Sequence, residues 1–140
     1  MVKPDVVGKR IARAALRLDQ AETILSRPVE ELIADVQGRD LASFYLFRAI
    51  QDCIDLAAHW VADEGWGSPD DAGSTFDVLA ERKAIGRDLA ERMRRAVGFR
   101  NLIAHGYDDL IDHSRLHKES QEGVAALRQF LAAVASAAGF

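Results

Sequence analysis

The chain has little of several features that mark particular classes of protein. Its only cysteine is Cys53, which excludes an intrachain disulfide and a cysteine pair for zinc, and its position in an apolar stripe predicts a buried thiol. No apolar run reaches the length of a membrane span, and the N-terminal segment lacks the apolar stretch of a signal peptide. We therefore expect a cytoplasmic protein that makes no use of a membrane.

The residues that are abundant favour helices. Ala, Leu, Arg and Glu dominate, only 3 prolines occur, and no stretch alternates cleanly between polar and apolar residues. A hydrophobic content of 49% with 29% charged residues is typical of a folded globular protein. The 140 residues fit one domain, residues 1–140, which is long enough to bury a single core. The composition predicts an all-α protein.

Apolar residues recur at spacings of three and four in several segments, as in amphipathic helices. Long helices are expected at about 6–25, 40–62, 88–104 and 114–138, with shorter helical stretches at 29–36 and 76–84. Asp40 is the expected N-cap of the second long helix, after an interruption at Gly38. Trp66 is expected to anchor the loop 63–74 onto the core. The pattern predicts an antiparallel bundle of four to five helices.

Charge is unevenly distributed along the chain. A net charge of −4 gives no general attraction to nucleic acid. The segment from Arg82 to Arg100 nevertheless holds seven basic residues against two acidic ones. Such a local basic face can hold phosphates, although charge alone favours an ordinary solvated helix surface.

The segment RNLIAHGYDDL, residues 100–110, departs from the pattern of a plain helical bundle. Arg100 continues the apolar stripe of its helix, so we expect its guanidinium to meet a carboxylate, a phosphate or water. Asn101 and His105 are i, i+4 neighbours on an adjacent face, and Tyr107 projects nearby if the helix ends after residue 104. The simpler interpretation is a polar network that closes the helix C-terminus.

These residues carry a resemblance to a known family. RNLIAHGY, residues 100–107, matches the Arg-x4-His-x-Tyr signature of the HEPN superfamily and resembles the HepT toxins of HepT/MntA toxin–antitoxin pairs. RAIQDCIDLAAHWV, residues 48–61, is similar to the second helix of HepT proteins, and GFRNLIAHGYDDL to their motif segment. The resemblance covers nearly the whole chain and implies the HEPN-like helical fold.

The resemblance implies a toxin of a type VII-like pair that acts as a metal-independent endoribonuclease on tRNA or mRNA. By position, Arg100 and His105 match the catalytic pair and Asn101 the supporting polar residue. A histidine exchanges protons near neutral pH, and an arginine suits the negative charge of a phosphate in the transition state. The implied products carry a 2′,3′-cyclic phosphate and a 5′-OH, and no metal or cofactor is expected.

The family also implies partners. HEPN toxins form homodimers in which two motifs line one cleft, and the cognate MntA-like nucleotidyltransferase antitoxin modifies a tyrosine with AMP, here matched by Tyr107. Asp55 matches a carboxylate of the second helix and is expected to pair with Arg100 or orient His105. An exposed polar face, which would include Gln51 and His59, is an equally good interpretation of that helix.

Other functions compete with this prediction. One is a non-catalytic HEPN-like module that binds a nucleotide or a partner nucleotidyltransferase without cutting RNA. A metal site at His113 and His117, which are i, i+4 neighbours, lacks a third ligand, so we expect surface residues at a helix start instead. The presence of Arg100, His105 and Tyr107 together favours the ribonuclease.

Overall fold

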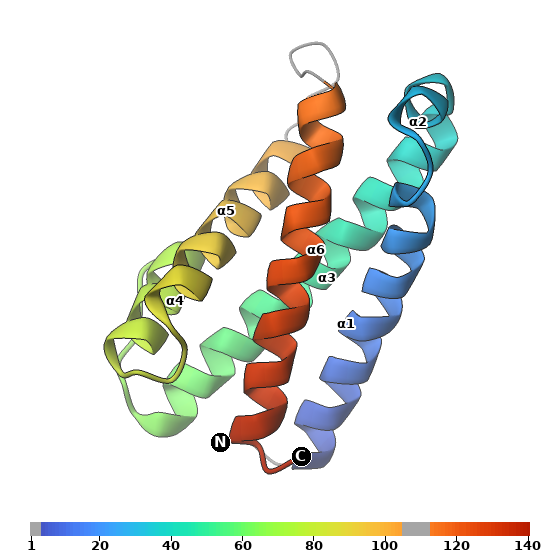
Figure 1. The fold of residues 1–140 in the computed structure, drawn as a ribbon. Coiled ribbons are helices and arrows are strands. Elements are labelled where there is room, and N and C mark those ends of the chain that lie inside the picture. Colours follow the sequence, from blue (N-terminus) through green and yellow to red (C-terminus); the bar gives the residue numbers. More distant parts are fainter. Residues whose placement is uncertain (1–3, 105–112) are drawn as a thin grey trace.

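The fold is built from helices, with no strand in the described part of the chain (Figure 1). The structure, a computed structural model, describes residues 4–104 and 113–140, and the side chains of 4–104 and 117–140. Its helices are α1 (Pro4–Leu25), α2 (Val29–Ala34), α3 (Val36–Glu64), α4 (Ala72–Glu81), α5 (Arg87–Ala104) and α6 (His113–Ala137). The all-α prediction is confirmed, whereas the described residues form six helices instead of four to five.

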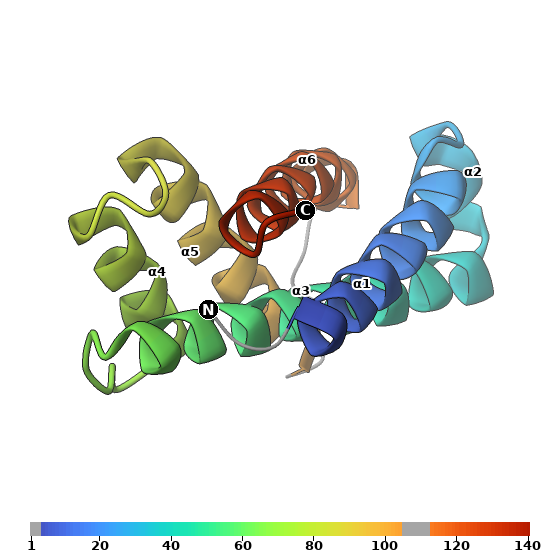
Figure 2. The same ribbon diagram turned by 90° about the horizontal axis from the view of Figure 1, so that it is seen from below.

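The four long helices form the bundle, and the two short ones cover its ends. α1 packs against α3 and α6, and α5 packs against the same two helices from the other side (Figures 1 and 2). α4 lies against α3 and α5, while α2 joins the ends of α1 and α3. α3 therefore runs between α1 and α5, and the side of it that faces away from α6 connects these two helices.

The core is formed by the apolar stripes of the long helices together with α4. Phe76 of α4 meets Phe130 of α6 edge-on at a centroid distance of 5.2 Å, and Trp60 of α3 lies 6.4 Å from the same ring. Each fully buried side chain of this size contributes about 1.5–3 kcal/mol by leaving water. Cys53 is buried as predicted, and burial together with the charge of Asp52 raises the pKa of its thiol, so it is neutral at physiological pH.

The start of α3 differs from the prediction. Asp40 is an exposed residue inside the helix, and Asp35 is the N-cap, where its carboxylate accepts a hydrogen bond of 2.9 Å from the backbone N–H of Gly38. Asp35 also leaves the helical conformation, with φ −106° and ψ 86°, which separates α2 from α3. Gly38 does not interrupt the helix, because its lack of a side chain leaves room for the capping carboxylate. A Cβ there would lie 2.5 Å from Asp35 Oδ2.

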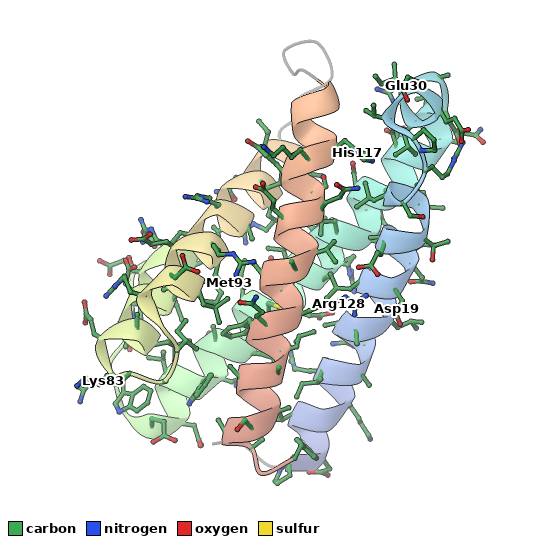
Figure 3. The ribbon with its side chains drawn as sticks, in the orientation of Figure 1. Asp19, Glu30, Lys83, Met93, His117 and Arg128 are labelled. Carbon is green, nitrogen blue, oxygen red and sulfur yellow. The ribbon has the colours of Figure 1, made fainter. Side chains whose placement is uncertain are left out.

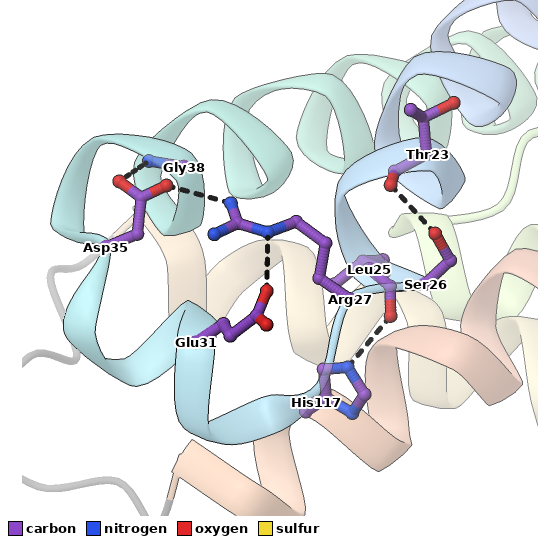
Figure 4. A network of polar contacts seen from close by, with 8 residues as sticks. All are labelled: Thr23, Leu25, Ser26, Arg27, Glu31, Asp35, Gly38 and His117. Atoms are coloured by element: carbon purple, nitrogen blue, oxygen red, sulfur yellow. Dashed lines mark hydrogen bonds and ion pairs between the residues drawn. The ribbon is translucent and has the colours of Figure 1, made fainter.

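The corner where α1, α2, α3 and α6 meet is closed by polar contacts (Figure 4). Arg27, between α1 and α2, donates to Asp35 at 2.8 Å and to Glu31 at 3.5 Å. His117 Nε2 of α6 donates to the carbonyl oxygen of Leu25 at 2.8 Å and so satisfies the last turn of α1. The pKa of Arg27 is raised, chiefly by its hydrogen bond with Asp35, so this arginine is a charged clamp.

The loop between α3 and α4 is fixed by its tryptophan. Trp66 is half-buried and packs against the core, and Arg82 lies over its ring at 5.8 Å, which confirms the predicted anchor. On the opposite side, Arg128 of α6 binds Asp19 of α1 at 2.7 Å (Figure 3). Of the helices described, none combines the length and the apolar character that crossing a bilayer requires.

Candidate functional site

Arg100 lies at the point where the buried side of α5 ends. Ala90, Met93 and Val97 are buried against α3 and α6, and Arg100 follows Val97 by about one turn as a half-buried residue. The predicted apolar stripe is therefore correct up to Val97, but Arg100 borders the core without entering it. A half-buried position lets a guanidinium keep contact with water while neighbouring groups fix its direction.

Two neutral amides hold the Arg100 guanidinium. Its Nη1 donates to Gln51 Oε1 of α3 at 3.1 Å, while Nε and Nη2 donate to Asn101 Oδ1 at 3.1 and 2.6 Å. The expected carboxylate partner is not found within residues 4–104 or 117–140. Because a guanidinium has five N–H donors, these three contacts orient it without using all of them and without neutralising its charge.

Asp55 is connected to Arg100 indirectly. Gln51 Nε2 donates to Asp55 Oδ1 at 3.1 Å, and Asp55 Oδ2 lies 3.4 Å from Arg10 Nη1 of α1. The predicted pairing of Asp55 with Arg100 is therefore wrong, because the longer amide of Gln51 lies one turn closer and takes that contact. Gln51 and Asp55 belong to one polar face of α3, and the exposed His59 follows one turn further along it.

Several sequence predictions fall on residues outside the described structure. His105 and Tyr107 are among them, as is the side chain of His113. His117 is described, and its Nε2 is taken by the carbonyl of Leu25, so it acts as a helix-end contact. Searched over the described residues, the chain shows no cluster of three or more potential metal ligands.

The basic stretch before Arg100 is largely used within the fold. Arg87 and Arg94 both bind Asp77 of α4, at 3.2 and 2.6 Å. Arg92 donates to Gln129 of α6 at 2.8 Å. These contacts tie α5 to its neighbours, so the high density of arginine in this stretch reflects helix packing more than a phosphate-binding face.

A cavity of about 670 Å³ lies between α3, α5 and α6, apart from the Arg100 network. Its lining is apolar at Leu46, Ile50 and Phe99, and the charges around it include both arginines and glutamates. Since Gln51, Arg100 and Asn101 are not among the lining residues, this cavity does not belong to the candidate site.

Two contacts of the site were not specified by the sequence. Gln51 was recognised only as part of a polar line, and Arg10 was not recognised at all. The signal for Arg10 is its spacing with Arg13 and Arg17, which repeats at three and four residues beside the apolar stripe of α1. Which helix this basic row faces depends on the tertiary structure.

An all-helical bundle with an arginine held at the end of α5 defines the class, and comparison with known families gives the family. The family model described as Ribonuclease HepT-like matches residues 15–134. The chain belongs to this HepT-like family, which confirms the resemblance found in its sequence.

Two relatives support the same family. The mRNA nuclease HepT of Shewanella oneidensis is 31% identical over 76 residues, which is 54% of this chain and 57% of that protein. A putative RNase of Archaeoglobus fulgidus is 32% identical over 89 residues, which is 63% of this chain and 66% of that protein. The aligned segments thus span less than two thirds of either relative.

Solved structures share the fold over nearly the whole chain. A toxin–antitoxin crystal structure with AMP-PNP superimposes with a TM-score of 0.86 and 20% identity, over 94% of this chain and 98% of that one. The tri-AMPylated Shewanella oneidensis HEPN toxin in complex with its MNT antitoxin gives a TM-score of 0.85 at 22% identity, with the same coverage. At this level of identity the likeness establishes the HEPN fold.

Proposed function

We propose that this protein is the toxin of a type VII-like toxin–antitoxin pair and acts as a metal-independent endoribonuclease. The observation that carries the proposal is Arg100, held by Gln51 and Asn101 with its charge uncompensated, in a chain of the HepT-like family. The two ribonuclease names among its relatives support the reaction class.

In the proposed reaction, RNA supplies its own nucleophile, the 2′-OH next to the scissile phosphate. His105 exchanges protons with the reacting oxygens, since an unperturbed histidine has a pKa of about 6.5. Arg100 binds the phosphate and stabilises its added negative charge in the transition state. Asn101 and Gln51 position Arg100. The 2′-oxygen attacks phosphorus and the 5′-oxygen leaves with a proton, giving a 2′,3′-cyclic phosphate and a 5′-OH.

The reaction needs both an acid and a base, and each protomer offers one motif histidine. We therefore propose a C2 homodimer in which both copies of Arg100 and His105 line one cleft. C2 is the commonest symmetry of soluble oligomers, and it places identical residues about a shared axis. A protein that is monomeric at the concentrations where it cleaves RNA would contradict this part of the proposal.

Control of the toxin is proposed at Tyr107. A cognate MntA-like nucleotidyltransferase would attach AMP to its phenol oxygen, and the added phosphate and bulk would exclude RNA by charge repulsion and steric overlap. This is supported by the HEPN-fold toxin that is AMPylated and complexed with an MNT antitoxin. Tyr107 stands two residues after His105, close enough along the chain for the modification to act on the same site.

The proposal is tested by RNA cleavage with protein made without an antitoxin, after mass spectrometry has shown Tyr107 to be unmodified. The assay contains EDTA and uses both tRNA and mRNA, with His105→Ala as the matched variant. We expect only the wild type to cleave and to leave cyclic-phosphate ends. No cleavage of either RNA would favour the alternative of a HEPN-like module that binds a nucleotide or a nucleotidyltransferase.

A further inference from the structure

A row of arginines runs along the side of α1 that adjoins α3. Arg10, Arg13 and Arg17 recur at spacings of three and four, so they share one side of the helix. Arg10 lies 3.4 Å from Asp55 and Arg13 lies 3.5 Å from Asp52. As the numbers rise on α1 they fall on α3, so the two helices are antiparallel along this row.

The last member of the row has no acidic partner. The antiparallel register places Arg17 opposite the turn of α3 that holds Arg48. Arg17 is half-buried, and its Nε is buried without a hydrogen-bond partner. Arg48 is exposed, and within the described side chains it forms no ion pair. Two neighbouring cations without a counter-ion favour an anionic ligand.

The row is continuous with the candidate site. From Arg10 the contacts pass through Asp55 and Gln51 to Arg100, so all of these residues lie along the side of α3 that connects α1 with α5. The surface carries five arginines (Arg10, Arg13, Arg17, Arg48 and Arg100) and two aspartates (Asp52 and Asp55). It is locally positive although the chain has a net charge of −4.

We infer that this arginine row binds the backbone phosphates of RNA beside the scissile phosphate at Arg100. The inference rests on the proposed ribonuclease function. At a rise of 1.5 Å per residue, Arg10 to Arg17 extends about 10 Å along α1, which matches the reach of one to two nucleotides. Contacts to phosphates position an RNA without reading its bases, so the row adds affinity and direction, not sequence preference.

The charge of the row favours RNA over a second copy of the chain. A C2 interface centred on the row would bring its arginines against the same row of the other copy, and like charges repel. A polyanion meets no such repulsion, and its binding releases counter-ions. The row therefore lies at the entrance to the shared cleft and outside the centre of the dimer interface.

The test uses Arg17→Gln/Arg48→Gln, because these two arginines have no acidic partner to leave unpaired. Arg10 and Arg13 are kept, since removing Arg13 would leave the buried charge of Asp52 uncompensated. The control is Lys83→Gln/Arg95→Gln, which removes two exposed cations elsewhere; Lys83 lies across the bundle from α1 (Figure 3). Thermal unfolding of both double variants verifies that each is folded.

Binding is measured in a His105→Ala background with single-stranded RNA of about four and about sixteen nucleotides. We expect Arg17→Gln/Arg48→Gln to weaken binding of the long RNA at least tenfold and to reduce its salt dependence by about one to two phosphate contacts, at a slope of about 0.7 each. Binding of the short RNA should change less than twofold, and the control should bind both RNAs as the parent does.

The outcomes separate this inference from the proposed function. If the wild type cleaves RNA while Arg17→Gln/Arg48→Gln binds the long RNA as tightly as the parent, the arginine row is wrong and the ribonuclease stands. If the double variant instead changes only the dimer dissociation in sedimentation, the row contacts a second copy and the inference is overturned. If the wild type neither cleaves nor binds RNA, the ribonuclease proposal itself fails.

Discussion

Arg27 and Arg100 both connect helices through several hydrogen bonds, yet their partners differ. Arg27 binds the carboxylates of Asp35 and Glu31, which compensate its charge and raise its pKa (Figure 4). Arg100 binds the amide oxygens of Gln51 and Asn101, which fix its direction and leave its charge intact. The comparison teaches that the chemical type of the partner, more than the number of contacts, separates a structural arginine from one available to a ligand.

The largest effect is expected from Arg100→Ala. If Arg100 stabilises charge in the transition state, this variant loses at least about 100-fold in RNA cleavage, while its Tm stays close to that of the wild type. Arg27→Ala should do the opposite and lower Tm with little change in cleavage. Cleavage rates and thermal unfolding of the two variants check this. Equal losses of activity in both would contradict the distinction between the two arginines.

A second prediction turns the environment of Arg100 into that of Arg27. Gln51→Glu places a carboxylate within hydrogen-bond distance of the guanidinium, so it competes with the RNA phosphate for the same charge. We expect cleavage to fall about tenfold, equivalent to about 1.4 kcal/mol.

The matched variant is Gln51→Met, which has a similar length and no charge. It removes one contact that orients Arg100, so we expect a smaller loss than in Gln51→Glu. Single-turnover rates on one RNA substrate compare the three proteins. A loss as large in Gln51→Met as in Gln51→Glu would show that orientation, and not charge, is what Gln51 supplies.

A third prediction breaks the closed corner around Arg27. Gly38→Ala places a Cβ only 2.5 Å from Asp35 Oδ2, so the capping carboxylate must move. We expect Tm to fall by several degrees although alanine is a better helix former than glycine. Gly123→Ala is the control, because a Cβ at that position would meet nothing within 4 Å, and its Tm should rise. A rise in both variants would contradict the steric argument.

The smallest effect concerns the charge of Asp35. The hydrogen bond from Arg27, and then that from the Gly38 N–H, lowers the pKa of Asp35 below its ordinary value of 3.8. The ionised carboxylate therefore stabilises the fold above pH 3.8, and this stabilisation is lost as the pH falls through the lowered pKa.

Asp35→Asn tests this dependence, since asparagine keeps the capping oxygen and removes the charge. Its Tm should lie slightly below that of the wild type at pH 7, and the difference should disappear in acid, by about pH 2. Asp40→Asn, an exposed position in the same helix, should follow the wild type throughout. A difference that persists in strong acid would assign the effect to the cap geometry instead.

The four long helices were predictable because their apolar stripes repeat over many turns, and the ends of α5 and α6 fall within one residue of those expected. The start of α3 was not predictable in this way. Asp35 and Asp40 are both acceptable caps by residue type, and the choice of Asp35 depends on Arg27, which reaches it from the preceding turn. Likewise, Asp55 was a reasonable partner for Arg100 until the lateral position of α3 gave Gln51 that contact.

Local order along the chain was enough to establish the all-α class, the buried thiol, the anchoring tryptophan and membership of the HepT-like family, since each depends on residue types at short spacings. Which side chains meet across helices was decided by the tertiary structure. The contacts of Arg100 with Gln51 and of Arg10 with Asp55 join residues about 45 to 50 positions apart, and their existence depends on how α1, α3 and α5 lie against one another. Such pairings have no periodic signal, because a helix fixes only which residues share its face.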